Sequence, residues 1–253
     1  MRANIGIQTF TIRKAQKRNI RAAYLPLIEL GIRKFEIARM DFSERNALAV
    51  RELIDEFGIE VVAIQVKPKD VFHKVEKVVD FCKTVGCTRV VISMLPFGCI
   101  LGSEAKFYDF IATLDGWYDT YKEYGITLAY HHHNWEYVRL SSGKTRMDEL
   151  LERTERIRIV HDTYWTARSG IAPEREIGRF GNRLIGIHLR DLAHSRRLLD
   201  VVPHDTAIGE GVIDFGRVLS AAEAVGCEYY VIEQKTNKPY PEIEKSFRYL
   251  SEI

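Results

Sequence analysis

The sequence predicts a single (β/α)8 barrel, an α/β fold of alternating strands and helices that spans residues 1–253. The length of 253 residues matches the roughly 250 residues typical of this fold. Short, continuously apolar, β-rich runs alternate with amphipathic helical patterns, as expected when strands of a parallel sheet are buried on both faces. An amphipathic stretch that ends in glycine precedes a strand several times, first at Gly31, Gly58 and Gly86. Their spacing of roughly 30 residues fits a repeated βα unit.

Each of the eight units contributes one expected strand and one expected helix. The strands are residues 4–10, 34–38, 60–66, 89–95, 127–132, 158–164, 184–189 and 229–233. The helices are residues 20–30, 44–57, 71–85, 104–124, 146–154, 173–180, 214–225 and 241–251. Ser43, Ser103 and Thr145 stand where helix N-caps are expected, and Pro173 suits a first helical turn. No glycine-rich dinucleotide fingerprint follows the first strand, which ranks a doubly wound open sheet lower.

Composition narrows the possible partners. Lys and Arg number 37 against 35 Asp and Glu, for a formal charge of +2, so no global basic excess calls for nucleic acid. The N-terminus lacks the apolar stretch of a secretory signal. No run approaches the roughly 18 apolar residues that span a bilayer. We therefore expect a cytoplasmic protein with a small-molecule substrate and no membrane or nucleic-acid partner.

Four expected strands end in residue types that bind metals. An apolar run at 126–130 continues into three consecutive histidines, and three later runs deliver one acid or histidine each. These strand-end residues are His131, His132, His133, Asp162, His188 and Glu233. The active site of such a barrel lies at the carboxyl ends of its strands. Side chains that meet there would form a metal site of mixed nitrogen and oxygen ligands.

Strand alternation decides which histidines face the pocket. Side chains of successive residues point to opposite faces of a strand. His131 and His133 are therefore expected in the pocket, while His132 lies in the barrel wall. By the same parity, His161 points away from Asp162 and belongs to the wall.

Purely structural roles would also account for the remaining strand-end residues. A salt bridge to an arginine would satisfy Asp162, since a buried unpaired charge is costly. A single histidine on an apolar strand, such as His188, is often a hydrogen-bonded core residue. Arg190 shares the face of His188 and would hold either a substrate oxygen or an acid. Asp191 caps the strand end or orients a ligand.

Two loop acids are open in the same way. Glu136 lies beyond its strand, so it is either an exposed loop acid or a general base that folds back. Glu210 lies between Gly209 and Gly211, in either a plain turn or a loop whose backbone approaches a ligand.

Six motifs in order along the chain resemble the xylose-isomerase-like TIM barrels of the sugar phosphate isomerase/epimerase superfamily. They are GIQTFTIR at 6–13, YHHHNWE at 130–136, DTYW at 162–165, HLRD at 188–191, GEGVID at 209–214 and IEQ at 232–234. The resemblance implies one divalent metal ion (Mn, Zn, Co or Mg) held by four strand-end residues. Three fall on Asp162, His188 and Glu233. The fourth falls on His131, where many members carry glutamate.

The resemblance implies an isomerase or epimerase of a sugar, sugar phosphate or related polyol ketone, acting through an enediolate. Glu233 would move the proton, with Glu136 or His133 on the opposite face of the substrate. The expected substrate-binding residues are Asn134, Trp135, Trp165, Arg190 and Glu210, with Arg39 and Lys67 as further candidates for hydroxyl or phosphate groups.

Three other functions remain as alternatives. The triple histidine also resembles inosose dehydratases, in which the same enolate would expel a hydroxyl group. An apurinic-site endonuclease would need a three-metal cluster and further strand-end histidines, which residues 65–68 and 93–96 do not supply. A non-catalytic sugar-binding protein is the third. The substrate, the metal and the oligomeric state stay open, and a homo-oligomer is compatible with the sequence.

Overall fold

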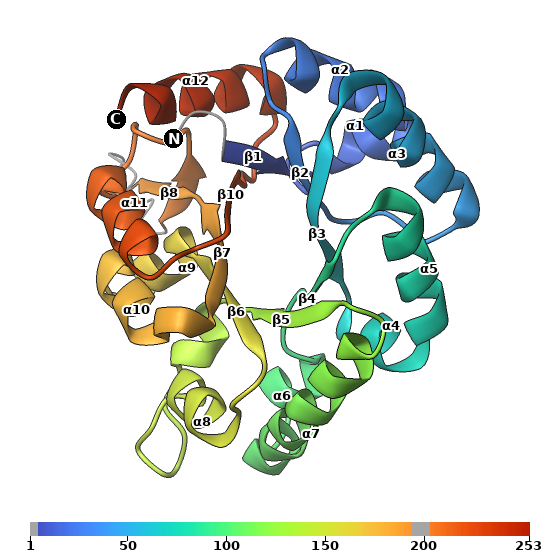
Figure 1. The fold of residues 1–253 in the computed structure, drawn as a ribbon. Coiled ribbons are helices and arrows are strands. Elements are labelled where there is room, and N and C mark those ends of the chain that lie inside the picture. Colours follow the sequence, from blue (N-terminus) through green and yellow to red (C-terminus); the bar gives the residue numbers. More distant parts are fainter. Residues whose placement is uncertain (1–4, 194–202) are drawn as a thin grey trace.

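A computed structural model describes residues 5–193 and 203–253. Its centre is a closed barrel in which the strands follow the order β1-β10-β7-β6-β5-β4-β3-β2, and every neighbouring pair is parallel (Figure 1). The barrel strands are β1 (Ile5–Gln8), β2 (Lys34–Ile37), β3 (Glu60–Val66), β4 (Arg89–Ile92), β5 (Thr127–His131), β6 (Arg158–Asp162), β7 (Leu184–Leu189) and β10 (Tyr229–Ile232). The predicted (β/α)8 barrel is confirmed.

Helices form the outer ring around the barrel (Figure 1). They are α1 (Arg13–Arg18), α2 (Ile20–Glu29), α3 (Glu44–Phe57), α4 (Pro68–His73), α5 (Val75–Val85), α6 (Phe97–Leu101), α7 (Glu104–Lys122), α8 (Arg146–Arg153), α9 (Thr163–Arg168), α10 (Pro173–Phe180), α11 (Phe215–Ala224) and α12 (Pro239–Glu252). Single 3-10 turns are η2 (Asn134–Tyr137) and η3 (Gly181–Arg183). None of the helices in the described ranges is long and apolar enough to cross a membrane.

Local sequence signals explain most element boundaries. Ser43 caps α3, its side chain accepting a hydrogen bond from the Asn46 amide, and Thr145 caps α8 in a reciprocal pair with Asp148. Gly58 ends α3 with a φ of 63°, which glycine adopts without steric cost. Ser103 occupies the predicted N-cap position of α7, although its side chain makes no capping hydrogen bond.

Several elements differ from the prediction. The expected helix at 71–85 is two helices, because Pro68 starts α4 directly after β3 and Lys74 leaves helical geometry at φ −137° and ψ 40°. Strands expected at 89–95 and 158–164 end earlier, at Ile92 and Asp162. Of the first expected strand, residue 4 lies outside the described residues. A hairpin of β8 (Asp191–Ala193) and β9 (His204–Thr206) was not predicted.

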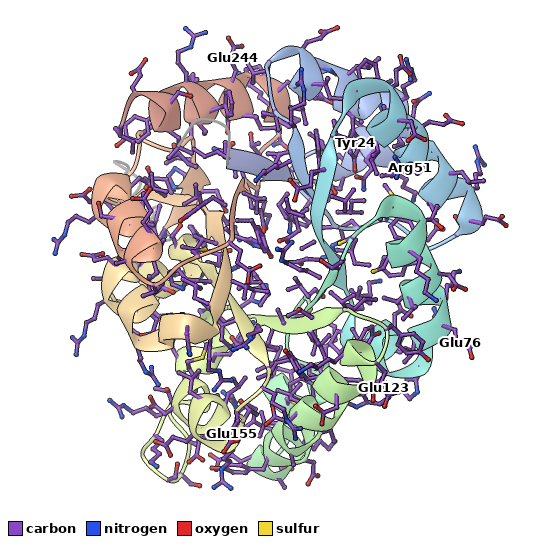
Figure 2. All side chains as sticks on the ribbon, in the orientation of Figure 1. Tyr24, Arg51, Glu76, Glu123, Glu155 and Glu244 are labelled. Atoms are coloured by element: carbon purple, nitrogen blue, oxygen red, sulfur yellow. The ribbon has the colours of Figure 1, made fainter. Side chains whose placement is uncertain are left out.

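Apolar side chains fill two layers. A small cluster inside the barrel includes Val62, Val91, Ala129, Val160 and Val231. A much larger cluster lies between strands and helices. There, the ring of Tyr24 stacks on Phe35 at 4.7 Å, and Figure 2 shows Tyr24 between α2 and the barrel. In the same view the charged side chains Arg51, Glu76, Glu123, Glu155 and Glu244 lie on the outer rim (Figure 2).

Candidate metal centre

The carboxyl ends of four adjacent strands bring together the predicted metal ligands. His131 ends β5, Asp162 ends β6, His188 lies near the end of β7, and Glu233 directly follows β10. These strands are neighbours in the barrel, in the order β10-β7-β6-β5. One potential ligand atom from each residue lies within 4.8 Å of those of the other three, and all four residues are buried.

The potential ligand atoms of this cluster lie close together, but the histidine nitrogens that face the carboxylates do not form hydrogen bonds with them. His131 Nε2 lies 3.5 Å from Asp162 Oδ2, and neither ring nitrogen of His131 makes a hydrogen bond with the described residues. His188 Nδ1 lies 2.9 Å from Glu233 Oε2, but without hydrogen-bond geometry. Buried polar groups are normally paired, so these nitrogens fit a cation better than an empty protein interior. Two imidazoles and two carboxylates suit Zn, Mn or Co.

Both carboxylates of the cluster are also held by hydrogen bonds from residues that are not proposed ligands. Asp162 Oδ1 accepts a hydrogen bond of 3.0 Å from the Trp165 amide and so caps α9, while Oδ2 faces the histidines. Glu233 Oε2 accepts a hydrogen bond of 3.0 Å from Gln8 Nε2, and Glu233 Oε1 lies 3.3 Å from Arg190 Nη1. These contacts fix both side chains before any ligand arrives.

A buried glutamate on β2 orients His188. Glu36 Oε1 lies 2.8 Å from His188 Nε2, and Glu36 Oε2 accepts 2.8 Å from the Tyr229 hydroxyl. Occupation of Nε2 by Glu36 turns Nδ1 toward the cluster, the usual arrangement behind a metal-binding histidine. Burial lowers the pKa of His188, but the Glu36 and Glu233 carboxylates outweigh it and raise the pKa to about 10. Metal binding at Nδ1 therefore competes with protonation.

Glu36→Gln is expected to weaken divalent-metal affinity by about 10- to 100-fold, as is typical when a residue behind a metal-binding histidine is lost. Glutamine keeps the size of the side chain and removes its charge. Calorimetric titration with Zn²⁺ measures the effect, and Glu60→Gln, at the exposed start of β3, is the matched control. Equal affinity in Glu36→Gln and the wild type would show that Glu36 does not act on the site.

Arg190 lies against the cluster as a bound counter-ion. Its Nη1 lies 3.0 Å from Asp162 Oδ2 and 3.3 Å from Glu233 Oε1, and its other edge binds Asp205 of β9 at 2.8 and 3.1 Å. The guanidinium also packs over the rings of Tyr164 and Trp165, at 4.8 and 5.3 Å. Of the two roles left open for Arg190, the structure shows the contact with acids.

The model of the xylose isomerase-like TIM barrel matches residues 25–253 of this sequence. The chain belongs to that family. Inosose dehydratase of Geobacillus thermodenitrificans (strain NG80-2) is 28% identical over 145 residues, which cover 52% of this chain and 47% of the dehydratase. The chain thus matches about half of the length of that curated relative.

Solved structures of other proteins share the whole fold. A sugar phosphate isomerase/epimerase from Parabacteroides distasonis ATCC 8503 superposes with a TM-score of 0.79 at 18% identity, covering 98% of this chain and 93% of the other. The IOLI protein with a bound zinc atom gives a TM-score of 0.75 at 15% identity, covering 98% and 97%. At these identities the likeness extends to the fold.

The three histidines at the end of β5 point alternately inward and outward, as strand parity predicts. His132 points outward, where its Nε2 lies 3.0 Å from His161 Nδ1 and accepts 3.2 Å from the Asp162 amide. Both rings pack near Phe180 of α10. Burial lowers the pKa of His132 and of His161, the latter to about 3. This neutral pair holds the ends of β5 and β6 together.

His133 lies at the edge of the cluster beside the predicted substrate-binding aromatics. Its ring centroid is 4.8 Å from that of His131 and 5.3 Å from the ring of Trp165. Burial, followed by the neighbouring His131, lowers the pKa of His133 to about 3, so its imidazole is neutral at pH 7. Asn134 and Trp135 follow in η2, with Trp135 41% exposed.

Two predicted site acids do not reach the cluster. Glu136 is buried in the wall, where its carboxylate accepts hydrogen bonds from the Tyr130 hydroxyl and the His133 amide. Glu210 is exposed and pairs with Lys245 of α12 at 2.9 Å. The glycines beside Glu210 bind Asp191: its carboxylate accepts hydrogen bonds from the amides of Gly209 and Gly211. A Cβ at Gly211 would lie 2.2 Å from Asp191 Oδ1, so close packing requires glycine there.

Glu136 is expected to make stability depend on pH. Burial raises its pKa to about 7 from an ordinary value of 4.5, against the hydrogen bonds that lower it. The folded state then holds a proton that the unfolded state has lost, so the stabilisation is present below about pH 4.5 and declines toward pH 7. The free energy of unfolding should fall by about 1.4 kcal/mol per pH unit in this window.

Glu136→Gln should remove this pH dependence. Urea unfolding between pH 5 and pH 8 measures it, with Glu123→Gln, beyond the end of α7, as the control. The same slope in Glu136→Gln and the wild type would contradict the shifted pKa of Glu136.

The sequence did not predict three residues that hold the cluster or its arginine, Gln8, Glu36 and Asp205, nor the inner-layer residue Gln65. Glu36 could have been predicted from the sequence, because an acid in the middle of an apolar strand needs a buried partner. Gln65 lies on β3 in register with Val91 of the inner layer, and its Nε2 has no hydrogen-bond partner among the described residues. Asp205 depends on the unpredicted hairpin.

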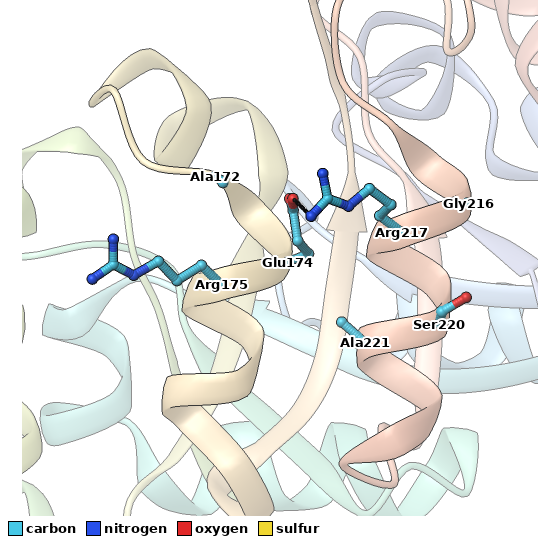
Figure 3. Close-up of a pocket in the computed structure, with 7 residues that line it drawn as sticks. All are labelled: Ala172, Glu174, Arg175, Gly216, Arg217, Ser220 and Ala221. Carbon is cyan, nitrogen blue, oxygen red and sulfur yellow. Dashed lines mark ion pairs between the residues drawn. The ribbon is translucent and has the colours of Figure 1, made fainter.

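A hollow on the outer surface does not coincide with the cluster. It is a cavity of about 620 Å³ between α10 and α11, crossed by the ion pair of Glu174 and Arg217 at 3.3 Å (Figure 3). Arg175 points away from that pair in Figure 3. None of the cluster residues lines it, so we place the chemistry at the strand ends.

Proposed function

We propose that the protein is a divalent-metal-dependent isomerase or epimerase of a sugar, sugar phosphate or related polyol ketone, acting through an enediolate. The observation that carries the proposal is the buried convergence of His131, Asp162, His188 and Glu233 at the carboxyl face of the barrel, where neither ring nitrogen of His131 has a hydrogen-bond partner among the described residues. Membership of the xylose isomerase-like family and the fold shared with a sugar phosphate isomerase/epimerase support it.

The four side chains would hold one ion, which we propose to be Zn, Mn, Co or Mg. The zinc atom of the IOLI protein supports a metal in this fold. When bound, the ion would polarise the substrate carbonyl and lower the pKa of the neighbouring carbon acid. Among the described residues, one group of at least three such side chains has this geometry. A three-metal nuclease would need further donors.

Glu233 is the proposed base that removes and returns the carbon-bound proton. Burial raises its pKa, but Arg190 and His188 outweigh burial and lower the pKa to about 2, so the carboxylate is ionised. Gln8 fixes the orientation of this carboxylate. His133, a neutral imidazole beside His131, would serve the opposite face of the substrate. Trp165, which packs on His133, would cover the apolar face of the sugar.

Solvent isotope exchange tests the proposed reaction. The Mn²⁺-loaded protein would be incubated with ketoses, ketose phosphates and inososes in D₂O and followed by NMR and mass spectrometry. We expect deuterium next to the carbonyl of at least one compound, without loss of water. Removal of the metal by a chelator should abolish the exchange, and added Mn²⁺ should restore it. Turnover that survives in the metal-free protein would refute the metal-dependent mechanism.

A dehydratase is the second candidate, favoured by the similarity to inosose dehydratase over 145 residues. The proton abstraction would be the same, followed by expulsion of a hydroxyl group as water. The same experiment separates the two, because dehydration lowers the product mass by one water molecule and isomerisation conserves it.

A further inference from the structure

Two arginines that form no ion pair with the described residues both lie against the ring of Phe10, at the rim beyond the ends of β1 and β2. The guanidinium carbon of Arg13 lies 3.9 Å from the centroid of the Phe10 ring, and that of Arg39 lies 5.5 Å from it. Within residues 5–193 and 203–253, neither guanidinium forms an ion pair. Arg190, on the other side of the cluster, is by contrast matched by three carboxylates. The rim therefore carries positive charge that no ion pair with the described residues compensates.

A short chain of hydrogen bonds connects this rim to the candidate base. The Phe10 amide donates 2.6 Å to Gln8 Oε1, while Gln8 Nε2 donates 3.0 Å to Glu233 Oε2. Arg13 Nη1 donates 2.8 Å to the Phe10 carbonyl. Burial and the charge of Arg39 lower the pKa of Arg13, whereas Glu233 raises it. Arg13 therefore interacts electrostatically with both Arg39 and the cluster residue Glu233.

Backbone strain marks the position of the second arginine. Arg39 has a φ of 58°, a left-handed conformation that non-glycine residues rarely adopt, and it is the only such residue among those described. Hydrogen bonds hold the backbone of the preceding residue in place. The Ala38 amide donates a hydrogen bond of 2.8 Å to Thr9 Oγ1, and the Ala38 carbonyl accepts one of 2.9 Å from Gln16 Nε2. Strain that is held by its surroundings concentrates at ligand-binding positions.

The rim continues into a basic hollow. Arg39 borders a cavity of about 460 Å³ between α1, the start of α2 and the loop before α3. Five of the residues that line it are basic and one is acidic: Lys17, Arg18, Arg21, Arg39, Arg45 and Asp41. Arg21 is paired with Glu56, but the other basic residues would still attract an anion toward the arginine pair.

We propose that Arg13 and Arg39 form a subsite for a terminal oxyanion, so that the substrate is a phosphorylated or carboxylated sugar and not a neutral one. The inference rests on the proposed function for the identity of the rest of the ligand. Guanidinium groups bind phosphate and carboxylate oxygens through paired N–H donors. An oxyanion between the two arginines would also relieve their mutual repulsion.

Direct anion binding tests the subsite separately from turnover. Inorganic phosphate and acetate would each be titrated calorimetrically into the Mn²⁺-loaded protein. We expect Arg13→Met and Arg39→Gly to weaken phosphate binding by about 10- to 100-fold, the loss typical of a charged hydrogen-bond partner. Arg51→Met, which removes an exposed arginine paired with Asp55 on α3, should change nothing. Phosphate affinity that is absent, or unchanged in both variants, would overturn the subsite.

Arg39→Gly separates a binding defect from misfolding, because glycine adopts the left-handed backbone without strain. Its Tm should not fall below that of the wild type, and a loss of phosphate affinity would then report the missing guanidinium. Stronger dependence of acetate than of phosphate on the two arginines would indicate a sugar acid, and the reverse a sugar phosphate.

Isotope exchange distinguishes failure of the anion subsite from failure of the proposed enzymatic function. If neutral sugars exchange as well as their phosphates or acids and Arg39→Gly leaves KM unchanged, the subsite is refuted and the enzymatic proposal stands. If phosphate binding depends on the arginines but no sugar exchanges, the subsite stands and the enzymatic proposal fails. With an anionic substrate, Arg39→Gly should raise KM about 10- to 100-fold with little change in kcat.

Discussion

Glu233→Gln is expected to lower kcat by about 10²- to 10⁴-fold, the contribution typical of a general base. Glutamine keeps an oxygen that can accept from Gln8, but it cannot take up a proton. The measurement is the rate of solvent deuterium incorporation at saturating Mn²⁺, so that weaker metal binding does not limit the rate. Bound metal, quantified in the same samples, separates loss of the ligand from loss of the base.

Glu228→Gln is the matched control for this variant. Glu228 lies at the opposite end of the same strand, exposed and paired with Arg89. We expect its activity to stay within about twofold of the wild type, because exposed ion pairs contribute little. Glu233→Gln with bound metal and a rate within tenfold of the wild type would remove Glu233 as the base.

Arg190→Met is expected to reduce the free energy of unfolding of the metal-free protein by about 3–5 kcal/mol. Arg190 is the cation that faces three buried carboxylates, Asp162, Glu233 and Asp205, at distances of 2.8 to 3.3 Å. Its removal leaves these negative charges together in a largely buried site. A divalent ion should restore part of the loss, because it places positive charge beside Asp162 and Glu233.

Two comparisons make the Arg190 prediction specific. Arg190→Lys keeps the charge but loses the planar fork that spans the acids, so a smaller loss is expected. Arg153→Met removes an exposed arginine paired with Glu149, and a change of at most about 1 kcal/mol is expected. Urea unfolding with and without Zn²⁺ measures all three. A metal-free Arg190→Met protein as stable as Arg153→Met would contradict the counter-ion role.

The order of strands and the residues at their ends could be predicted from the sequence, because both follow from local patterns. Apolar runs locate the strands, and the twofold alternation along each strand separates His131 and Asp162 from His132 and His161. Parallel strands in a closed barrel then place all their carboxyl ends on one face. These three rules suffice to bring the four proposed ligands together without knowledge of any loop.

The contacts behind the ligands depend on which strands become neighbours after closure. Glu36 lies 152 positions from His188, and Gln8 lies 225 positions from Glu233. Neither pair leaves a periodic trace in the sequence. Short helices such as α1, α6 and α9, of five or six residues, were missed for a related reason, since so few residues show no helical periodicity.

The direction in which loop side chains point could not be predicted from the sequence either. Glu136 and Glu210 sit in motifs that resemble the family, but the 3-10 turn after β5 directs Glu136 toward Tyr130, and Lys245 on α12 draws Glu210 to the surface. A motif gives the residue type at a position, whereas its orientation follows from the turn that carries it.

Anomalous scattering from a crystal grown with Mn²⁺ or Zn²⁺ tests the central claim most directly. We predict one strong peak at the carboxyl face, about 2.0–2.2 Å from donor atoms of His131, Asp162, His188 and Glu233. A peak held by other residues, several peaks at the strand ends, or no peak despite tight binding in solution would contradict the proposed metal centre.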